Sequence, residues 1–214
     1  MPKKKPIIGV SGAVGAGKSQ VARIFGDLGG LVIDSDRLNH EVLEDPDTIR
    51  TIVGWWPEPL LGPDQRLDRA ALARIVFADP EKKRRLESLV YPLIAARRDD
   101  MIRAGWNDQR VTAFILDSPL LFESNLDRLC DTVVFVEAGE DVRVLRLKQR
   151  RGWDVDELRR REKWQWPPAD KRSRAEYTIL NEGSIEGLRV CTTRVFDQII
   201  ARYAPQTEEP RSTQ

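Results

Sequence analysis

The chain has 214 residues, of which 41% are hydrophobic and 32% charged. This length is enough for one α/β domain with insertions, or for a core with small appended lobes. No run of about 18 apolar residues occurs, and the first residues lack the apolar segment of a signal peptide, so we expect neither a membrane span nor a leader. Cys130 and Cys191 lie far apart without metal-ligand spacing, which favours free thiols and a reducing, cytoplasmic location.

The first expected strand leads into a glycine-rich loop that is typical of phosphate binding. Residues 7–10 form an apolar run, residues 12–19 match G-x-x-x-x-G-K-[ST] at every fixed position, and a helix is expected over 18–28. Backbone N–H groups of such a loop converge on phosphate oxygens at the amino terminus of the helix. Lys18 is expected to reach the β- and γ-phosphates, and the hydroxyl of Ser19 to hold Mg²⁺. The pattern predicts binding of a nucleoside triphosphate.

The remaining elements alternate between apolar strands and helices. Helical periodicity is expected in three segments, residues 37–53, 69–77 and 80–103. Four further strands are expected, most of them continuously apolar: residues 31–33, 111–116, 132–136 and 177–180. Such strands, separated by helices, predict a parallel sheet covered on both faces, which is a three-layer α/β fold.

Two mostly helical segments add no strand to this sheet. Residues 55–110 form an insertion, and residues 150–175 form an arginine-rich lid. Between Arg143 and Arg174 there are twelve Lys or Arg and five Asp or Glu, although the net charge of the whole chain is +1. A basic segment in a chain with a phosphate loop favours a small polyphosphate ligand over nucleic acid or a membrane surface. The expected nucleotide-binding core comprises residues 6–54, 111–149 and 176–204, and the polar tail 205–214 is expected to be disordered.

Acidic residues follow two of the expected strands. Asp34 comes after the second strand and Asp117 after the third, and ligands of open α/β sheets bind beyond these carboxyl ends. Asp34 is placed to orient or deprotonate an acceptor hydroxyl, and Asp117 to hold a metal-bound water. Asp36 fits an active-site role and a helix N-cap equally well. A phosphate cradle, a metal and a carboxylate are groups that phosphoryl transfer requires.

The rest of the chain indicates the class of P-loop protein. No Asn-Lys-x-Asp run that would recognise guanine is present, and Asp117 is followed by Ser118 and Pro119 rather than by the second acid of an ATP-driven remodelling enzyme. A helical insertion for the acceptor and an arginine-rich lid are typical of kinases that act on small metabolites. The sequence therefore predicts a small-molecule kinase with a P-loop NTPase-like fold.

From Ile7 to about Ile200 the chain resembles the dephospho-coenzyme A kinase family. The narrowest pattern is Asp117-Ser118-Pro119-Leu120-Leu121-Phe122-Glu123 followed by Gln165, Lys171, Ala175, Asn181 and Gly183. Further matching runs are the phosphate loop and residues 32–36, 67–69, 86–92 and 146–150. The resemblance implies a five-stranded parallel core with a helical acceptor domain and a lid.

The resemblance also implies a reaction. ATP would phosphorylate the ribose 3′-hydroxyl of dephospho-coenzyme A, giving coenzyme A and ADP in the last step of coenzyme A biosynthesis, with Mg²⁺ as the metal. The expected partners are these small-molecule substrates, without nucleic acid or membrane, and the expected state is a monomer or a weak homo-oligomer.

Site residues are carried over from the family position by position. ATP binding is assigned to Gly12, Gly15, Ala16, Gly17, Lys18, Ser19 and Gln20. Catalytic roles are assigned to Lys18, Asp34, Asp117, Arg146, Arg150 and Arg161. Acceptor binding is assigned to Asp34, Arg69, Tyr91 and Pro92, and the metal to Ser19 and, through water, to Asp117.

Four positions depart from the family pattern. Tyr91 stands where the family commonly has histidine, so this position keeps a hydrogen-bond donor but cannot carry a positive charge to the acceptor. Gln20 replaces the usual threonine, and Arg151 and Glu176 replace aspartates of the lid and the last strand. Two alternatives are another small-molecule or nucleoside P-loop kinase and a non-catalytic nucleotide-binding regulator.

Overall fold

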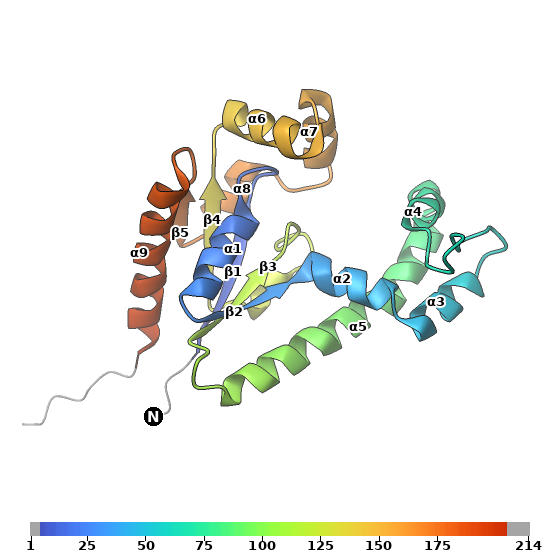
Figure 1. Cartoon of the computed structure of the whole chain (residues 1–214), viewed down its shortest axis with the longest axis horizontal. Helices are drawn as coiled ribbons and strands as arrows, with labels where there is room; N and C mark the ends of the chain where they lie inside the picture. Colours follow the sequence, from blue (N-terminus) through green and yellow to red (C-terminus); the bar gives the residue numbers. More distant parts are fainter. Residues whose placement is uncertain (1–4, 205–214) are drawn as a thin grey trace, which may run out of the picture. The chain divides into compact units, whose positions relative to one another are not determined.

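Figure 1 shows the computed structural model, which describes residues 5–204. The described chain divides into two compact units, one made of residues 5–33 and 105–204 and the other of residues 34–104. The tail 205–214, for which disorder is expected, lies outside the described residues. Within residues 5–204 no helix is long and apolar enough to cross a bilayer.

The larger unit is built on a five-stranded sheet with strand order β2-β3-β1-β4-β5 (Figure 1). Its strands are β1 (Ile7–Gly12), β2 (Gly30–Asp34), β3 (Ala113–Asp117), β4 (Thr132–Glu137) and β5 (Tyr177–Leu180). The central strand β1 pairs in parallel with β3 and β4, and β4 pairs in parallel with β5. Every expected strand overlaps an observed one, and the expected α/β fold with a five-stranded parallel sheet is confirmed.

Side chains that alternate along the strands separate the two faces of this sheet. One face, with Ile8 and Val134, belongs to a buried core that includes Phe25 of α1 (Lys18–Asp27) and Phe196 of α9 (Ile185–Tyr203). The two phenylalanine ring centroids are 5.3 Å apart, so α1 and α9 cover this face together. On the other face α8 (Pro168–Ser173) contacts β1, which brings the end of the lid segment to the sheet.

The other helices of the larger unit follow β3 and β4. They are the short 3-10 helix η1 (Leu126–Leu129), α6 (Glu140–Arg151) and α7 (Val155–Glu162). The arginine-rich segment 150–175 thus begins at the end of α6, includes α7 and α8, and belongs to the same compact unit as the sheet.

The smaller unit is helical and has a core of its own. Its helices are α2 (Ser35–Leu43), α3 (Pro46–Val53), α4 (Arg69–Ala78) and most of α5 (Pro80–Asn107). Val42 and Ile52 share one buried cluster with Leu60, Leu72 and Val90. Because α2 and α3 contribute to this core, the unit begins at Asp34 rather than at residue 55, and it ends at Ala104 rather than at residue 110.

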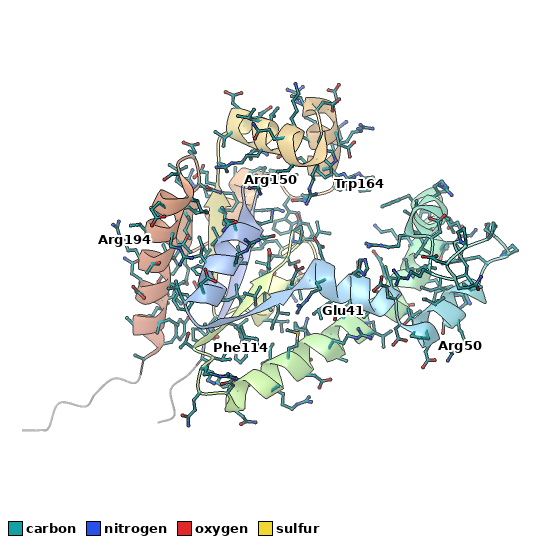
Figure 2. All side chains as sticks on the ribbon, in the orientation of Figure 1. Glu41, Arg50, Phe114, Arg150, Trp164 and Arg194 are labelled. Carbon is teal, nitrogen blue, oxygen red and sulfur yellow. The ribbon has the colours of Figure 1, made fainter. Side chains whose placement is uncertain are left out.

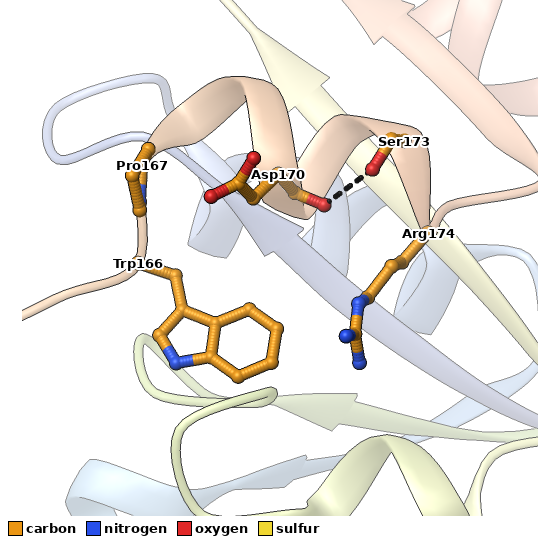
Figure 3. A pocket seen from close by; sticks show the side chains of 5 residues that line it. All are labelled: Trp166, Pro167, Asp170, Ser173 and Arg174. Carbon is orange, nitrogen blue, oxygen red and sulfur yellow. Dashed lines mark hydrogen bonds between the residues drawn. The ribbon is translucent and has the colours of Figure 1, made fainter.

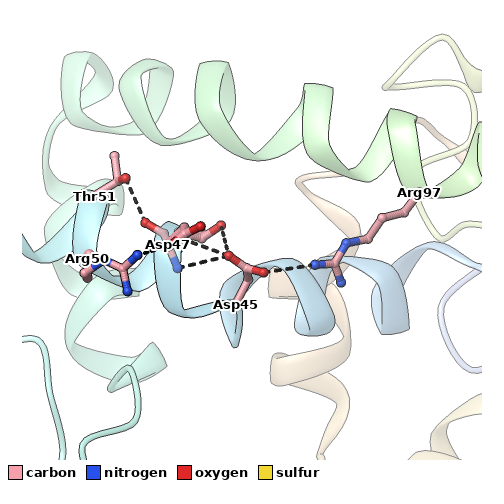
Figure 4. Close-up of polar contacts among 6 residues, drawn as sticks. Asp45, Asp47, Arg50, Thr51 and Arg97 are labelled. Carbon is pink, nitrogen blue, oxygen red and sulfur yellow. Dashed lines mark hydrogen bonds and ion pairs between the residues drawn. The ribbon is translucent and has the colours of Figure 1, made fainter.

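The single helix expected over residues 37–53 is two helices, α2 and α3. Between them Asp45 accepts hydrogen bonds from the backbone N–H groups of Asp47 (3.1 Å) and Thr48 (3.2 Å), and Pro46 has no N–H to extend α2. Arg97 of α5 lies 3.5 Å from the Oδ2 atom of Asp45 and ties this junction to α5 (Figure 4). Both helices bury residues in the same core. The apolar residues of the two helices therefore resemble the pattern of one continuous helix in the sequence.

Candidate active site

The phosphate loop connects β1 to α1, as the pattern predicts. Gly15 and Gly17 have φ angles of 79° and 96°, in the left-handed region that other residues rarely adopt. A Cβ atom on Gly17 would lie 2.3 Å from the Nδ2 atom of Asn181, and one on Gly12 would lie 2.4 Å from the carbonyl oxygen of Val136. The glycines are therefore required both by backbone conformation and by space.

Asn181 holds the loop from the end of β5. Its buried Nδ2 group donates to the carbonyl oxygen of Ala16 at 2.8 Å. Arg146 of α6 in turn donates to the carbonyl oxygen of Asn181 at 2.9 Å and to its Oδ1 atom at 3.3 Å. Sequence reasoning gave Asn181 no role beyond a family pattern, and its place after the last strand was the signal that could have found it.

Lys18 lies over the loop. Its Nζ group donates to the carbonyl oxygens of Gly12 (3.3 Å) and Ala13 (3.2 Å). Ser19 is exposed in the first turn of α1, and the N–H of Gln20 bonds to the carbonyl of Gly17 at 3.0 Å. The ammonium and the hydroxyl of the motif therefore both belong to the loop and the start of its helix.

Asp117 and Ser19 offer oxygen ligands. Asp117 is the last residue of β3, is 5% exposed and pairs in register with Val10 of β1. No group of three or more His, Cys, Asp or Glu gathers for a metal anywhere in residues 5–204. Mg²⁺ commonly takes one or two protein oxygens and fills its other positions with water and phosphate oxygens. A carboxylate and a hydroxyl fit that metal.

Asp34 is both the last residue of β2 and the N-cap of α2. Its Oδ1 atom accepts a hydrogen bond from the backbone N–H of Arg37 at 3.0 Å, and its side chain is partly exposed. The N-cap role that was open for Asp36 therefore belongs to Asp34, and Asp36 is exposed in the first turn of the helix.

The three arginines to which a role in phosphoryl transfer is assigned do not lie together in this structure. Arg146 reaches the loop through Asn181. Arg150 is exposed at the last turn of α6 (Figure 2). Arg161 donates to Glu157 at 2.8 Å, and its guanidinium carbon lies 4.6 Å from the ring centroid of Trp153. In this structure Arg161 is held within the lid.

The residues assigned to the acceptor lie on two helices of the smaller unit. Arg69 is the exposed first residue of α4, and Tyr91 and Pro92 lie within α5. Tyr91 is 56% exposed, and its hydroxyl donates to the Oε1 atom of Glu87 at 2.9 Å. Partial burial and, after it, this bond to the Glu87 carboxylate raise the pKa of Tyr91 to about 12. The hydroxyl therefore remains protonated at neutral pH.

Two family motifs, the run 117–123 and the later Gln165 and Lys171, meet in a buried network. The Nζ group of Lys171, whose side chain is 1% exposed, lies 2.8 Å from Glu123 Oε1 and donates to Gln165 Oε1 at 2.9 Å and to the Pro119 carbonyl at 3.2 Å. Glu123 also accepts the backbone N–H of Trp166 at 2.7 Å. Side chains of the two motifs, which are far apart in the sequence, therefore pair with one another in the structure.

The Trp166 side chain packs next to this network. Its ring is stacked on Phe122 with centroids 5.9 Å apart, and the guanidinium carbon of Arg174 lies 4.5 Å from its centroid. Trp166 and Arg174 line an open hollow of about 430 Å³ whose other lining residues are Pro167, Asp170 and Ser173 (Figure 3). The lid is thus packed onto the loop that follows β3.

Comparison with known proteins identifies the family. The family model for dephospho-CoA kinase (CoaE) matches residues 6–187, which is most of the chain. The chain belongs to the dephospho-CoA kinase family. It is 38% identical over 206 residues to a dephospho-CoA kinase of Corynebacterium diphtheriae, covering 94% of this chain and 99% of that protein. With one from Geobacillus kaustophilus it shares 35% identity over 187 residues, covering 85% and 90% of the two chains.

Solved structures agree on the fold. The crystal structure of TT1252 from Thermus thermophilus has a TM-score of 0.77 and 34% identity and covers 96% of this chain and 100% of its own. The dephospho-CoA kinase from Campylobacter jejuni has a TM-score of 0.68 and 24% identity, with 93% and 99% covered. The predicted dephospho-CoA kinase family and the predicted kinase class are confirmed by these matches.

Proposed function

We propose that this chain transfers the γ-phosphoryl group of ATP to the ribose 3′-hydroxyl of dephospho-coenzyme A, giving coenzyme A and ADP. The observation that carries the proposal is an intact phosphate loop, held by Asn181, in a chain that matches the dephospho-CoA kinase family over residues 6–187. We further propose that the protein acts as a monomer or a weak homo-oligomer.

The donor side is formed by the loop and its neighbours. The loop N–H groups from Gly15 to Gln20 bind the ATP phosphates, and the Lys18 ammonium leaves the loop carbonyls for the β- and γ-phosphate oxygens. Ser19 would hold Mg²⁺ directly and Asp117 would hold it through water. When bound, Mg²⁺ would neutralise negative charge on the phosphate oxygens.

Asp34 is the proposed base. Its Oδ1 atom caps α2, and within residues 5–204 its Oδ2 atom has no hydrogen-bond partner, so Oδ2 can accept the proton of the 3′-hydroxyl. The 3′-oxygen then bonds to the γ-phosphorus as the bond between that phosphorus and the β,γ-bridging oxygen breaks, and ADP leaves. The carboxylate both orients the hydroxyl and takes up its proton.

Cationic and polar groups complete the proposed site. Arg146, Arg150 and Arg161 bind the transferring phosphoryl group, for which a planar guanidinium is better suited than an ammonium. Arg161 must first exchange its contact with Glu157 for the phosphoryl oxygens. Arg69, Tyr91 and Pro92 bind dephospho-coenzyme A, with the neutral Tyr91 hydroxyl as one hydrogen-bond donor.

A turnover assay tests this function. The purified chain is incubated with ATP and Mg²⁺ and with either dephospho-coenzyme A or a panel of common nucleosides and nucleotides. We expect ADP release and formation of coenzyme A only with dephospho-coenzyme A. Turnover of a nucleoside in its place would favour the alternative kinase, and ATP binding without turnover of any acceptor would favour a regulator.

A further inference from the structure

A buried arginine joins the phosphate loop to the lid. Arg143 of α6 is 7% exposed, and its Nη1 group donates to the carbonyl oxygen of Val14, in the loop, at 3.0 Å. The same Nη1 group donates to the Oε1 atom of Glu162, the last residue of α7. Glu162 directly follows Arg161 in the chain. One nitrogen atom of Arg143 therefore contacts both the phosphate loop and α7, the helix that carries Arg161.

Packing alone does not explain why an arginine is buried at position 143. A buried ion pair can often be replaced by apolar side chains of similar size without loss of stability, because removing two charges from water is costly. Here the Nε atom is also buried and has no hydrogen-bond partner within residues 5–204, which adds to that cost. The contact with a loop carbonyl oxygen points to a role in the geometry of the loop.

That role follows from the planarity of the peptide. In a trans peptide the C=O and the next N–H point in opposite directions, so Arg143 directs the N–H of Gly15 away from itself by holding the carbonyl of Val14. Gly15 has a φ of 79°, and a glycine allows the preceding peptide to turn over at low cost. A loop that binds phosphate through N–H groups needs this peptide to keep one orientation.

We propose that Arg143 is a positioning residue for the nucleotide. It holds the Val14–Gly15 peptide in the orientation that presents the Gly15 N–H to phosphate, and through Glu162 it couples that orientation to the position of α7. The inference rests on the proposed nucleotide binding but does not depend on the identity of the acceptor.

The test measures nucleotide affinity directly. Binding of fluorescent ADP, without any acceptor, is compared in the wild type, Arg143→Met, Glu162→Gln and the double variant, together with the backbone 15N–1H resonance of Gly15. A matched control is Arg189→Met, which breaks an ion pair of 2.7 Å with Asp27 whose side chains are 49% and 46% exposed. We expect about tenfold weaker binding in Arg143→Met, a shifted Gly15 resonance and unchanged affinity in the control.

Steady-state kinetics distinguish a role of Arg143 in positioning the nucleotide from a general loss of structure. We expect the KM for ATP to rise in Arg143→Met while the KM for the acceptor stays constant, and the two single variants to be non-additive in the double variant. ADP affinity within twofold of the wild type, or equal increases of both KM values with an unshifted Gly15 resonance, would overturn the proposal. If Arg143→Met does not fold, Glu162→Gln tests the proposal in its place. An unchanged ADP affinity and an unchanged Gly15 resonance in Glu162→Gln would refute the coupling to α7.

Discussion

Lys171 and Glu123 form an ion pair in which Nζ and Oε1 lie 2.8 Å apart, with the lysine side chain 1% exposed and the glutamate side chain 15% exposed. Glu123 belongs to the loop that follows β3 and Asp117, and Lys171 belongs to α8 at the end of the lid segment. The pair therefore joins the segment that begins at the proposed metal-binding carboxylate to the base of the lid.

Removing one partner of this pair is expected to be costly. Lys171→Met leaves the Glu123 carboxylate buried without its counter-charge, so we expect a loss of about 3 kcal/mol in the free energy of unfolding, measured by urea denaturation. The double variant Lys171→Met with Glu123→Gln is expected to recover part of this loss. Arg189→Met is the control, and its exposed pair should contribute less than about 1 kcal/mol. Equal losses of unfolding free energy in Lys171→Met and in the control would contradict a stabilising role of the Lys171–Glu123 pair.

A methyl group on Gly17 is expected to disable the loop. Gly17→Ala requires an alanine at a φ of 96° and places its Cβ 2.3 Å from Asn181 Nδ2, so Asn181 has to leave the carbonyl of Ala16. We expect the affinity for ATP, measured by calorimetry, to fall by about tenfold or more. Gly183→Ala is the control, because nothing lies within 4 Å of its added Cβ. If both variants bind ATP like the wild type, the loop does not require glycine at position 17.

Asp34→Asn separates the chemical role of Asp34 from its structural one. Asparagine is as good an N-cap as aspartate, so α2 and the melting temperature should be preserved while the base is lost. We expect kcat to fall by about a factor of a thousand and the Kd for ATP to stay constant. Asp47→Asn, on the exposed first turn of α3 and outside the proposed site, should leave kcat within about twofold. Full activity of Asp34→Asn would refute its assignment as base.

The hydroxyl of Tyr91 is expected to ionise at a higher pH than an ordinary tyrosine. Its pKa is raised to about 12, because partial burial and the Glu87 carboxylate both favour the neutral phenol. The contribution of this group to stability is therefore fully present below the ordinary pKa of 10.0 and is lost as the pH rises through about 12. The ultraviolet difference titration between the wild type and Tyr91→Phe should show a midpoint near 12, and Glu87→Gln should lower it. A midpoint near 10 would show that the Tyr91–Glu87 contact does not persist in solution.

Sequence patterns located most of the elements but not their boundaries. The phosphate loop and every strand of the sheet were predictable, because glycine spacing and continuous apolar runs reflect local backbone and burial requirements. The break at Asp45 and Pro46 was hidden, since α2 and α3 bury one common face. For the same reason the smaller unit begins at Asp34, where helices join a shared core, and not where proline and glycine first interrupt the helical pattern.

The sequence by itself determined the parallel α/β fold, the phosphate loop and the family, because apolar runs, glycine spacing and short motifs can each be recognised from residue types and their positions along the chain. Only the tertiary structure decided that Asn181 holds the loop, that Glu123 pairs with Lys171 and that Arg143 reaches Val14. These partners are separated by 48 to 165 positions along the chain, and only folding brings their side chains within hydrogen-bond distance.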